Sequence, residues 1–167
     1  MNWEIDLNCD MGEGMPNDAV IIPYVSSISI ACGGHAGNKD SIRETIQLAK
    51  RANVSIGAHP SYPDRENFGR KKMDIPYSSL EESLISQLSI IRAIASEENY
   101  PLVHLKPHGA LYNQAAIDPV LAQLIVTISK NMDPRWSIWG LPNSALATCC
   151  AAQSVQFIPE GFADRSY

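Results

Sequence analysis

Short apolar segments of strand length alternate along the chain with segments of helical periodicity. Segments rich in apolar and β-branched residues predict six strands, at Trp3–Asn8, Ser26–Cys32, Val54–Ala58, Leu102–Leu105, Ser137–Gly140 and Val155–Ile158. Between them, apolar residues recur at spacings of three and four, which predicts helices at about Asp40–Ala52 and Ser79–Glu98, from Asp118 onward, and at Asn143–Ala152. Because strands and helices alternate, we expect a mostly parallel sheet with helices outside it.

The length of the chain limits how this sheet closes. A parallel (β/α) barrel usually needs about eight strand–helix units and roughly 250 residues. This sequence has 167 residues and about six predicted strands. We therefore expect an α/β fold that is either an open sheet or an incomplete barrel. No linker or repeat interrupts the pattern, so residues 1–167 are expected to form a single domain.

The composition disfavours several classes of protein. With 13 basic and 18 acidic residues and a net charge of -5, the chain lacks the basic surface that binds nucleic acid. No apolar stretch approaches the roughly 18 residues of a membrane span. The first residues lack the basic start and apolar core of a signal peptide. The four cysteines form no C-x-x-C pair, which indicates free thiols. We expect a cytoplasmic protein that contacts neither nucleic acid nor membrane.

Polar side chains with catalytic chemistry, including all four histidines, gather at the ends of the predicted strands. The segments are DLNCDMGEG (Asp6–Gly14), ACGGHAG (Ala31–Gly37), GAHPSYPD (Gly57–Asp64), HLKPHGALYN (His104–Asn113) and PEGFADR (Pro159–Arg165). The carboxyl ends of parallel strands lie on one face of a sheet, and ligands bind there in open sheets and in barrels alike. We therefore expect these segments to converge on one polar crevice.

The residue types at these strand ends suit metal binding or acid–base catalysis. They are Asp6, Asp10, Glu13, His35, His59, His108 and Glu160. Imidazole and carboxylate groups together suit a divalent ion such as zinc or manganese. Lys106 is placed to neutralise a substrate carboxylate or a developing oxyanion. His104 alternates with Val103 and Leu105, and we expect it to fill core or surface.

Three common functional motifs are absent from the sequence. The segment Gly33–Ser41 (GGHAGNKDS) lacks the glycine–lysine–hydroxyl order of a P-loop. The lack of a GxSxG elbow disfavours a serine hydrolase. The lack of GxGxxG after the first predicted strand disfavours a dinucleotide site.

The polar segments, together with FGR (Phe68–Arg70), resemble the LamB/YcsF family, whose bacterial members are the A subunit of 5-oxoprolinase. The resemblance spans almost the whole chain and implies an irregular (β/α) barrel related to the glycoside hydrolase/deacetylase superfamily. It also implies ATP-dependent opening of 5-oxo-L-proline to L-glutamate, in complex with 5-oxoprolinase subunits B and C. A five-membered lactam is an unstrained amide and a weak electrophile. Phosphorylation of its oxygen would turn that oxygen into a good leaving group before water attacks.

Resemblance and position together suggest roles for individual residues. The expected catalytic groups are Asp10, Glu13, Lys106, His108 and Glu160. The expected substrate-binding groups are Asn8, His59, Tyr112, Asn113 and Arg165, with Arg165 as an anion partner. By analogy with the related deacetylases, the expected ligands of a divalent metal are Asp6, His35 and His59. ATP is the expected cosubstrate.

Length separates this sequence from the family that it resembles, because family members usually continue beyond the ADRSY segment at Ala163–Tyr167. We therefore expect a domain that lacks the family's C-terminal part, is poorly active alone and self-associates through open sheet edges. Two other functions stay open. One is a metal-dependent, deacetylase-like hydrolase of amides or carbohydrates that acts alone. The other is a non-catalytic subunit that binds substrate for a partner.

Overall fold

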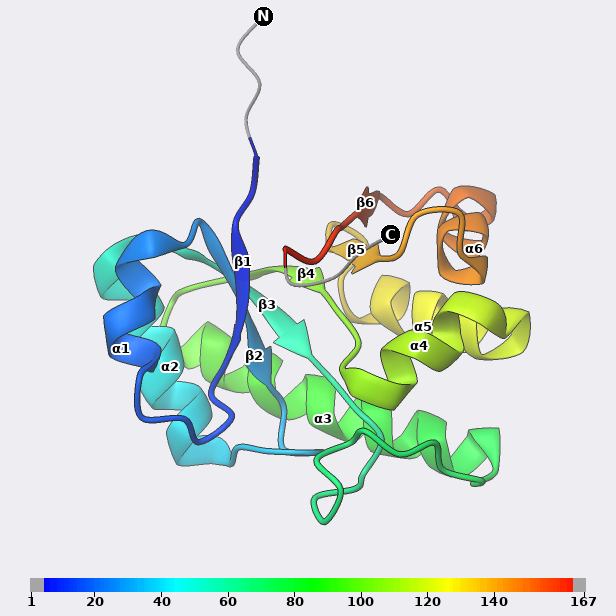
Figure 1. Ribbon diagram of the computed structural model, residues 1–167, viewed down its shortest axis with the longest axis horizontal. Helices are drawn as coiled ribbons and strands as arrows, with labels where there is room; N and C mark the ends of the chain where they lie inside the picture. The colour runs from blue at the N-terminus through cyan, green and yellow to red at the C-terminus, as the bar shows by residue number, and fades with distance from the viewer. Residues whose placement is uncertain (1–4, 164–167) are drawn as a thin grey trace, which may run out of the picture.

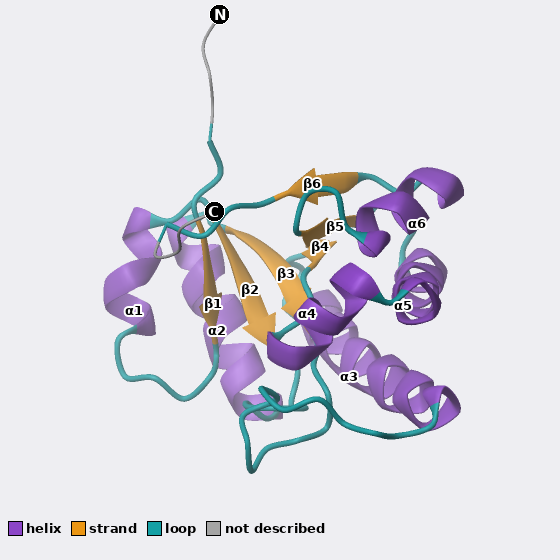
Figure 2. Ribbon diagram, turned by 45° about the vertical axis from the view of Figure 1, so that its right-hand side comes forward, coloured by secondary structure: helices purple, strands orange, loops and turns teal. Residues whose placement is uncertain are grey.

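The computed structural model describes residues 5–163, in which six parallel strands form one sheet (Figure 1). The strands are β1 (Asn8–Met11), β2 (Ser27–Ala31), β3 (Ser55–His59), β4 (Leu102–Leu105), β5 (Ser137–Gly140) and β6 (Phe157–Pro159). They lie side by side in the order in which they occur along the chain, and each is parallel to the next. Seen in Figure 2, the strands curl around a common inner side. The α/β fold predicted from the sequence is confirmed, with the sheet in the form of a half-barrel.

Helices cover the outer side of the curled sheet (Figure 1). They are α1 (Asp18–Ile21), the 3-10 helix η1 (Ile22–Tyr24), α2 (Lys39–Ala52), α3 (Tyr77–Glu97), α4 (Gly109–Ile117), α5 (Pro119–Met132) and α6 (Ala145–Gln153). The Asn38 side chain caps α2 by accepting hydrogen bonds from two backbone N–H groups of the first turn. The Asp118 side chain caps α5 in the same way, and Pro119 follows at the first helical position.

The two faces of the sheet differ sharply in polarity. On the outer face, Ile28, Ile30 and Ile56 are fully buried in the apolar core that the helices complete. On the inner face, Ser29 of β2 and His104 of β4 are also buried, but they are polar. Their side chains contact each other on the concave side of the sheet. This alternation follows from the two-residue period of a strand. Its consequence is a half-barrel whose interior is polar, as a reactive site requires.

The first strand begins later than the apolar pattern predicts. The pattern predicts Trp3–Asn8, whereas β1 starts at Asn8, which lies opposite Ser27 at the start of β2. Ile5 and Leu7, expected on a buried strand face, are 92% and 56% exposed. Residues 1–4 of the predicted strand lie outside the described residues. The later start places Asp10 inside β1 and leaves Asp6 before it.

Three helical segments, α1, η1 and α4, were not predicted. In α4 the buried residues Ala110, Leu111, Tyr112 and Ala115 are too close together in sequence to produce the spacing of a one-sided amphipathic helix. The sequence there looks like a loop after a strand, and the helix forms because its apolar residues are covered on several sides.

Two other expectations concern thiols and membranes. Cys9, Cys32, Cys149 and Cys150 are free thiols, as predicted. Among the helices of residues 5–163, none combines the length and the apolar character needed to cross a bilayer.

Candidate active site

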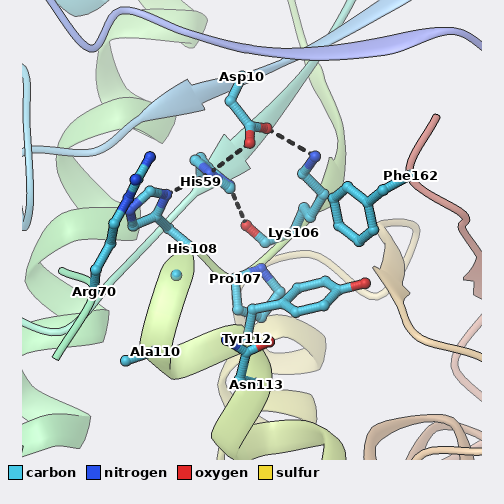
Figure 3. A pocket seen from close by; sticks show the side chains of 11 residues that line it. Asp10, His59, Arg70, Lys106, Pro107, His108, Ala110, Tyr112, Asn113 and Phe162 are labelled. Atoms are coloured by element: carbon cyan, nitrogen blue, oxygen red, sulfur yellow. Dashed lines mark hydrogen bonds and ion pairs between the residues drawn. The ribbon is translucent and has the colours of Figure 1, made fainter. Parts of the chain in front are cut away.

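A cavity of about 410 Å³ opens at the carboxyl ends of β1, β3 and β4 (Figure 3). Segments far apart in sequence meet there, as the parallel topology predicts. The polar side chains that line it are Asp10, His59, Arg70, Lys106, His108, Tyr112 and Asn113. Its volume lies near the lower end of the range of about 300–1,000 Å³ for ligand pockets, which suits a small ligand.

A carboxylate and three imidazoles form a compact cluster at the edge of this cavity. Glu13 Oε1 lies 3.0 Å from His35 Nε2, 3.5 Å from His108 Nδ1 and 3.9 Å from His59 Nε2. One ligand atom from each of these four residues lies within 4.8 Å of every other. The rings of His35 and His108 are stacked, with centroids 3.6 Å apart. Four potential ligands of a single ion therefore converge from four different segments.

Backbone carbonyls determine which ring nitrogens of this cluster carry protons. His59 Nδ1 lies 2.7 Å from the carbonyl oxygen of Lys106, and His108 Nε2 lies 2.9 Å from that of Phe68. A carbonyl oxygen can only accept, so each of these nitrogens donates its N–H. In the neutral rings, His59 Nε2 and His108 Nδ1 then carry lone pairs, although they face each other at 3.0 Å. Such a contact needs a proton or a cation between the two nitrogens.

Asp10 adds a further acceptor, because its Oδ2 lies 3.3 Å from His59 Nε2. Together with Glu13 Oε1 and His108 Nδ1, it surrounds that nitrogen with groups that accept hydrogen bonds. One extra proton on His59 would satisfy only one of these contacts at a time. A divalent cation would satisfy several of them at once, and the carbonyl-bound ring nitrogens are in the arrangement usual for histidine ligands. This donor set therefore fits a divalent metal ion.

The electrostatics of the cluster favour the forms of these side chains that bind metal. Burial lowers the pKa of His35, and burial with the neighbouring charges of His59 and His35 lowers the pKa of His108 to about 4. Burial would raise the pKa of Glu13, but its hydrogen bond to His35 and the charge of His59 outweigh that effect and lower it. The two imidazoles are therefore neutral near pH 7, and the carboxylate is ionised.

Lys106 is a buried cation held by acidic and amide oxygens. It is only 4% exposed, and its Nζ lies 2.7 Å from Asp10 Oδ1 and 2.9 Å from Asn8 Oδ1. Glu160 Oε2 approaches the same atom to 3.7 Å. Burial would raise the pKa of Asp10, but His59 and Lys106 outweigh it and hold that pKa well below its usual range. The result is an ammonium group fixed at the cavity floor beside an ionised carboxylate.

A buried polar layer supports Lys106 from below. The Ser29 hydroxyl donates to Asn8 Oδ1 at 3.1 Å and lies 3.1 Å from His104 Nε2. Since the only proton of this hydroxyl is used on Asn8, His104 Nε2 must be the donor in the second contact. His104 stacks on Trp139 at 4.3 Å between ring centroids, and burial lowers its pKa to about 3. His104 is thus a neutral core residue, in line with the expectation from the sequence.

The structure places the predicted site residues in three groups. Asp10, His59, Lys106, His108, Tyr112 and Asn113 line the cavity. Asn8, Glu13, His35 and Glu160 contact those residues from the side or from below. Asp6 is exposed, lies before β1 and accepts a hydrogen bond from the Ser27 hydroxyl at 2.6 Å. Arg165, the predicted anion partner, lies outside the described residues.

The set that could hold a metal differs from the predicted one. His35 and His59 belong to it as expected. The other two members are Glu13 and His108, and Asp6 is not one of them. The reason is the late start of β1, which leaves Asp6 near the amino end of the strand, away from the cluster at its carboxyl end. Sequence reasoning also gave no role to Arg70 and Phe162, which line the cavity. Their occurrence in the segments FGR (Phe68–Arg70) and PEGFADR (Pro159–Arg165) was the only available signal.

Comparisons with known proteins show the family of the chain and agree with its fold. The model of the LamB/YcsF family matches residues 5–167. The crystal structure of a lactam utilization protein from Thermus thermophilus superposes with a TM-score of 0.95 and 35% sequence identity, over 99% of this chain and 69% of that chain. A putative cellobiose-phosphate cleavage protein from Enterococcus faecalis V583 gives a TM-score of 0.64 at 12% identity, over 92% of this chain and 65% of that one. The second likeness concerns the fold alone.

Proposed function

The chain belongs to the LamB/YcsF family, and from this premise we propose that it acts on a cyclic amide, cleaving the lactam bond of 5-oxo-L-proline to give L-glutamate. The observation that carries the proposal is the Lys106–Asp10 ion pair, 2.7 Å long, beside the Glu13–histidine cluster in one small cavity. The similarity to the lactam utilization protein from Thermus thermophilus supports the same substrate class.

Lys106 would stabilise the charge that builds up on the lactam oxygen. When a nucleophile adds to an amide carbonyl, negative charge develops on the oxygen, and a fixed cation in a buried site stabilises it strongly. Asp10 and Asn8 hold the ammonium in place through contacts of 2.7 and 2.9 Å, so little reorganisation is needed when the charge appears. Asp10 and Asn8 act here by orienting Lys106.

The cluster of Glu13 and the three histidines would accept the proton of the attacking water. His59 Nε2 and the Glu13 carboxylate accept hydrogen bonds at the cavity edge and are suitable general bases. Alternatively, a divalent ion held by Glu13, His35, His59 and His108 would use the lone pairs of these groups as ligands, and the ion itself would supply the Lewis acidity that lowers the pKa of water. The later transfer of a proton to the ring nitrogen of the substrate completes cleavage of the amide bond.

We further propose that this reaction is coupled to ATP and needs subunits B and C of 5-oxoprolinase. The lactam is a weak electrophile. Transfer of the γ-phosphoryl group of ATP to its oxygen, with release of ADP, would make attack by water on the ring carbon easier. The C–N bond would then break as the nitrogen takes up a proton, and hydrolysis of the resulting acyl phosphate would release phosphate and glutamate. The sequence contains no P-loop. The nucleotide is therefore proposed to bind in another manner or largely through a partner subunit.

The test is reconstitution of the complete assembly from the 167-residue chain and subunits B and C. We expect glutamate to form from 5-oxo-L-proline when ATP and both partners are present. An equal rate without ATP would exclude the coupled mechanism. No glutamate under any of these conditions would contradict the proposed activity itself.

The Glu13–histidine cluster also favours a second candidate, a metal-dependent amide hydrolase that acts alone. This candidate predicts one bound metal ion per chain and cleavage of N-acetyl groups that a chelator stops, with neither ATP nor partners. Full activity of a metal-free preparation would contradict it.

A further inference from the structure

Two cationic side chains line the cavity from different sides, Lys106 from the end of β4 and Arg70 from the loop between β3 and α3 (Figure 3). The charge of Lys106 is already compensated, because its Nζ lies 2.7 Å from Asp10 Oδ1. Arg70 differs, since within residues 5–163 its guanidinium has no carboxylate within ion-pair distance. The group lies 5.4 Å from the centre of the Phe68 ring, and Arg70 is exposed. Among the residues that line the cavity, Arg70 is the uncompensated positive charge.

The backbone that carries Arg70 is fastened to the active-site cluster. The carbonyl of Phe68 accepts a hydrogen bond from His108 Nε2 at 2.9 Å, and that of Gly69 accepts one from the N–H of Ala110 at 2.9 Å. Arg70 itself donates its N–H to Asn67 at 3.0 Å. These bonds fix the loop at the cavity edge, while the long side chain of Arg70 is free to meet a ligand.

The same loop holds backbone strain directly before Arg70. Phe68 has a φ of 55° and Gly69 one of 63°, so a non-glycine residue occupies the left-handed region. A side chain at position 69 would stand 2.9 Å from His35 Cβ, so glycine is required there. A left-handed non-glycine residue is strained and persists where surrounding contacts enforce it, often at functional sites.

We propose that Arg70 binds the carboxylate of the substrate and so selects lactams that carry one over neutral lactams. The planar guanidinium matches a carboxylate with two parallel hydrogen bonds, which Lys106 cannot offer. With the carboxylate on Arg70, the rest of a small lactam extends across the cavity toward Lys106 and Asp10. The inference rests on the proposed function and adds to it the residue that sets substrate selectivity.

The test is binding, measured by isothermal titration calorimetry on the complete chain, so that it does not depend on turnover. The probes are 5-oxo-L-proline and 2-pyrrolidinone, the same ring without the carboxylate. We expect wild type to bind the carboxylated lactam about 10- to 100-fold more tightly, as a charge-assisted hydrogen bond allows. The variant Arg70→Gln should bind both rings equally, and Arg70→Lys should keep part of the preference. Lys71→Gln is the matched control, because Lys71 is the adjacent exposed cation outside the cavity lining.

Steady-state kinetics of the reconstituted assembly give a second readout. Arg70→Gln should raise KM for 5-oxo-L-proline about 10- to 100-fold with kcat little changed, because under this proposal Arg70 contacts the carboxylate and not the two atoms of the scissile bond. Equal binding of the two rings by wild type, binding of neither, or an undiminished preference in Arg70→Gln overturns the inference. A preference that depends on Arg70 in an assembly that forms no glutamate would support the inference and contradict the proposed function.

Discussion

Gly57 lies directly against the imidazole of His104, so closely that a methyl group at position 57 would overlap the ring. The two residues face each other across the register of β3 and β4. The absence of a side chain at Gly57 lets His104 reach Ser29, which bonds to Asn8, which in turn holds Lys106. The position of the reactive ammonium therefore depends on a glycine on the neighbouring strand.

Replacement of this glycine should destabilise the fold. Gly57→Ala overpacks the inner face, and we expect the free energy of unfolding to fall by about 1–3 kcal/mol. Urea denaturation would measure this loss. The double variant Gly57→Ala with His104→Ala should recover part of it, because the overlapping ring is gone.

Gly140→Ala on β5 is the matched control. A methyl group there would lie 3.2 Å from the side chain of Leu146 and 3.3 Å from the ring of Phe157, which is tight but does not overlap, so its loss of stability should be smaller. A Gly57→Ala protein with the same free energy of unfolding as wild type would contradict this prediction, because it would show that the His104 ring can move aside without loss of stability.

The buried imidazole of His104 should make stability depend on pH. Burial lowers its pKa from 6.5 to about 3 in the folded chain. Between these values the unfolded chain binds a proton that the folded chain does not, so stability is greatest above pH 6.5 and falls on acidification. From pH 8 to pH 5 this group should remove about 2 kcal/mol from the free energy of unfolding.

The variant His104→Asn isolates this effect, because the other titrating groups remain. We expect its loss of stability from pH 8 to pH 5, measured by urea denaturation, to be smaller than that of wild type. Equal losses in the two proteins would contradict the assignment of His104 as a neutral buried imidazole.

The cluster around Glu13 should bind a divalent ion. After treatment with a chelator, titration with zinc should give about one site per chain, as a set of three imidazoles and a carboxylate is expected to do. Glu13→Gln and His108→Ala should weaken zinc binding at least about 10- to 100-fold. Loss of a residue that only hydrogen-bonds to a metal ligand already has an effect of this size.

His104→Gln serves as the control for zinc binding, because it removes a buried histidine that lies outside the cluster. Equal zinc binding by wild type and Glu13→Gln would contradict the cluster as a metal site.

Open sheet edges should lead the chain to associate with itself. Within residues 5–163, β1 pairs only with β2 and β6 only with β5. Next to β1, Leu7 is 56% exposed, although it is apolar. Size-exclusion chromatography should show species larger than a monomer, and Leu7→Lys should reduce them, because a charge on an edge opposes pairing. A clean monomer for the wild-type chain would contradict this prediction.

Much of the fold was predictable because short apolar strands that alternate with segments of helical periodicity leave a strong local pattern. The predicted bounds of β4 (Leu102–Leu105) and β5 (Ser137–Gly140) agree with the structure residue for residue. The helices at Lys39–Ala52 and Pro119–Met132, which Asn38 and Asp118 cap, lie where the apolar spacing predicts helices. The start of β1 was not predictable, because it depends on pairing with β2 rather than on its own residues.

The site was predictable only as far as topology determines it. Parallel strands bring their carboxyl ends together, so Asp10, His59 and Lys106 could be expected to meet. The choice between Asp6 and Glu13 depends on where a strand begins, which the apolar pattern misjudged. Hydrogen bonds of a long loop place Arg70 at the cavity, and apart from its occurrence in the motif FGR the sequence contains no signal for such contacts.

The pairing of Asp10 with Lys106 is the centre of the proposed chemistry, and its removal is the most direct test. In the assembly reconstituted with subunits B, C and ATP, we expect Asp10→Asn to lower kcat/KM for glutamate formation from 5-oxo-L-proline at least about 100-fold, the usual scale for losing a preorganised charge contact. Asp40→Asn, an exposed aspartate on α2, should leave the rate unchanged, and circular dichroism should show both variants folded. A folded Asp10→Asn protein that forms glutamate at the wild-type rate would contradict the account.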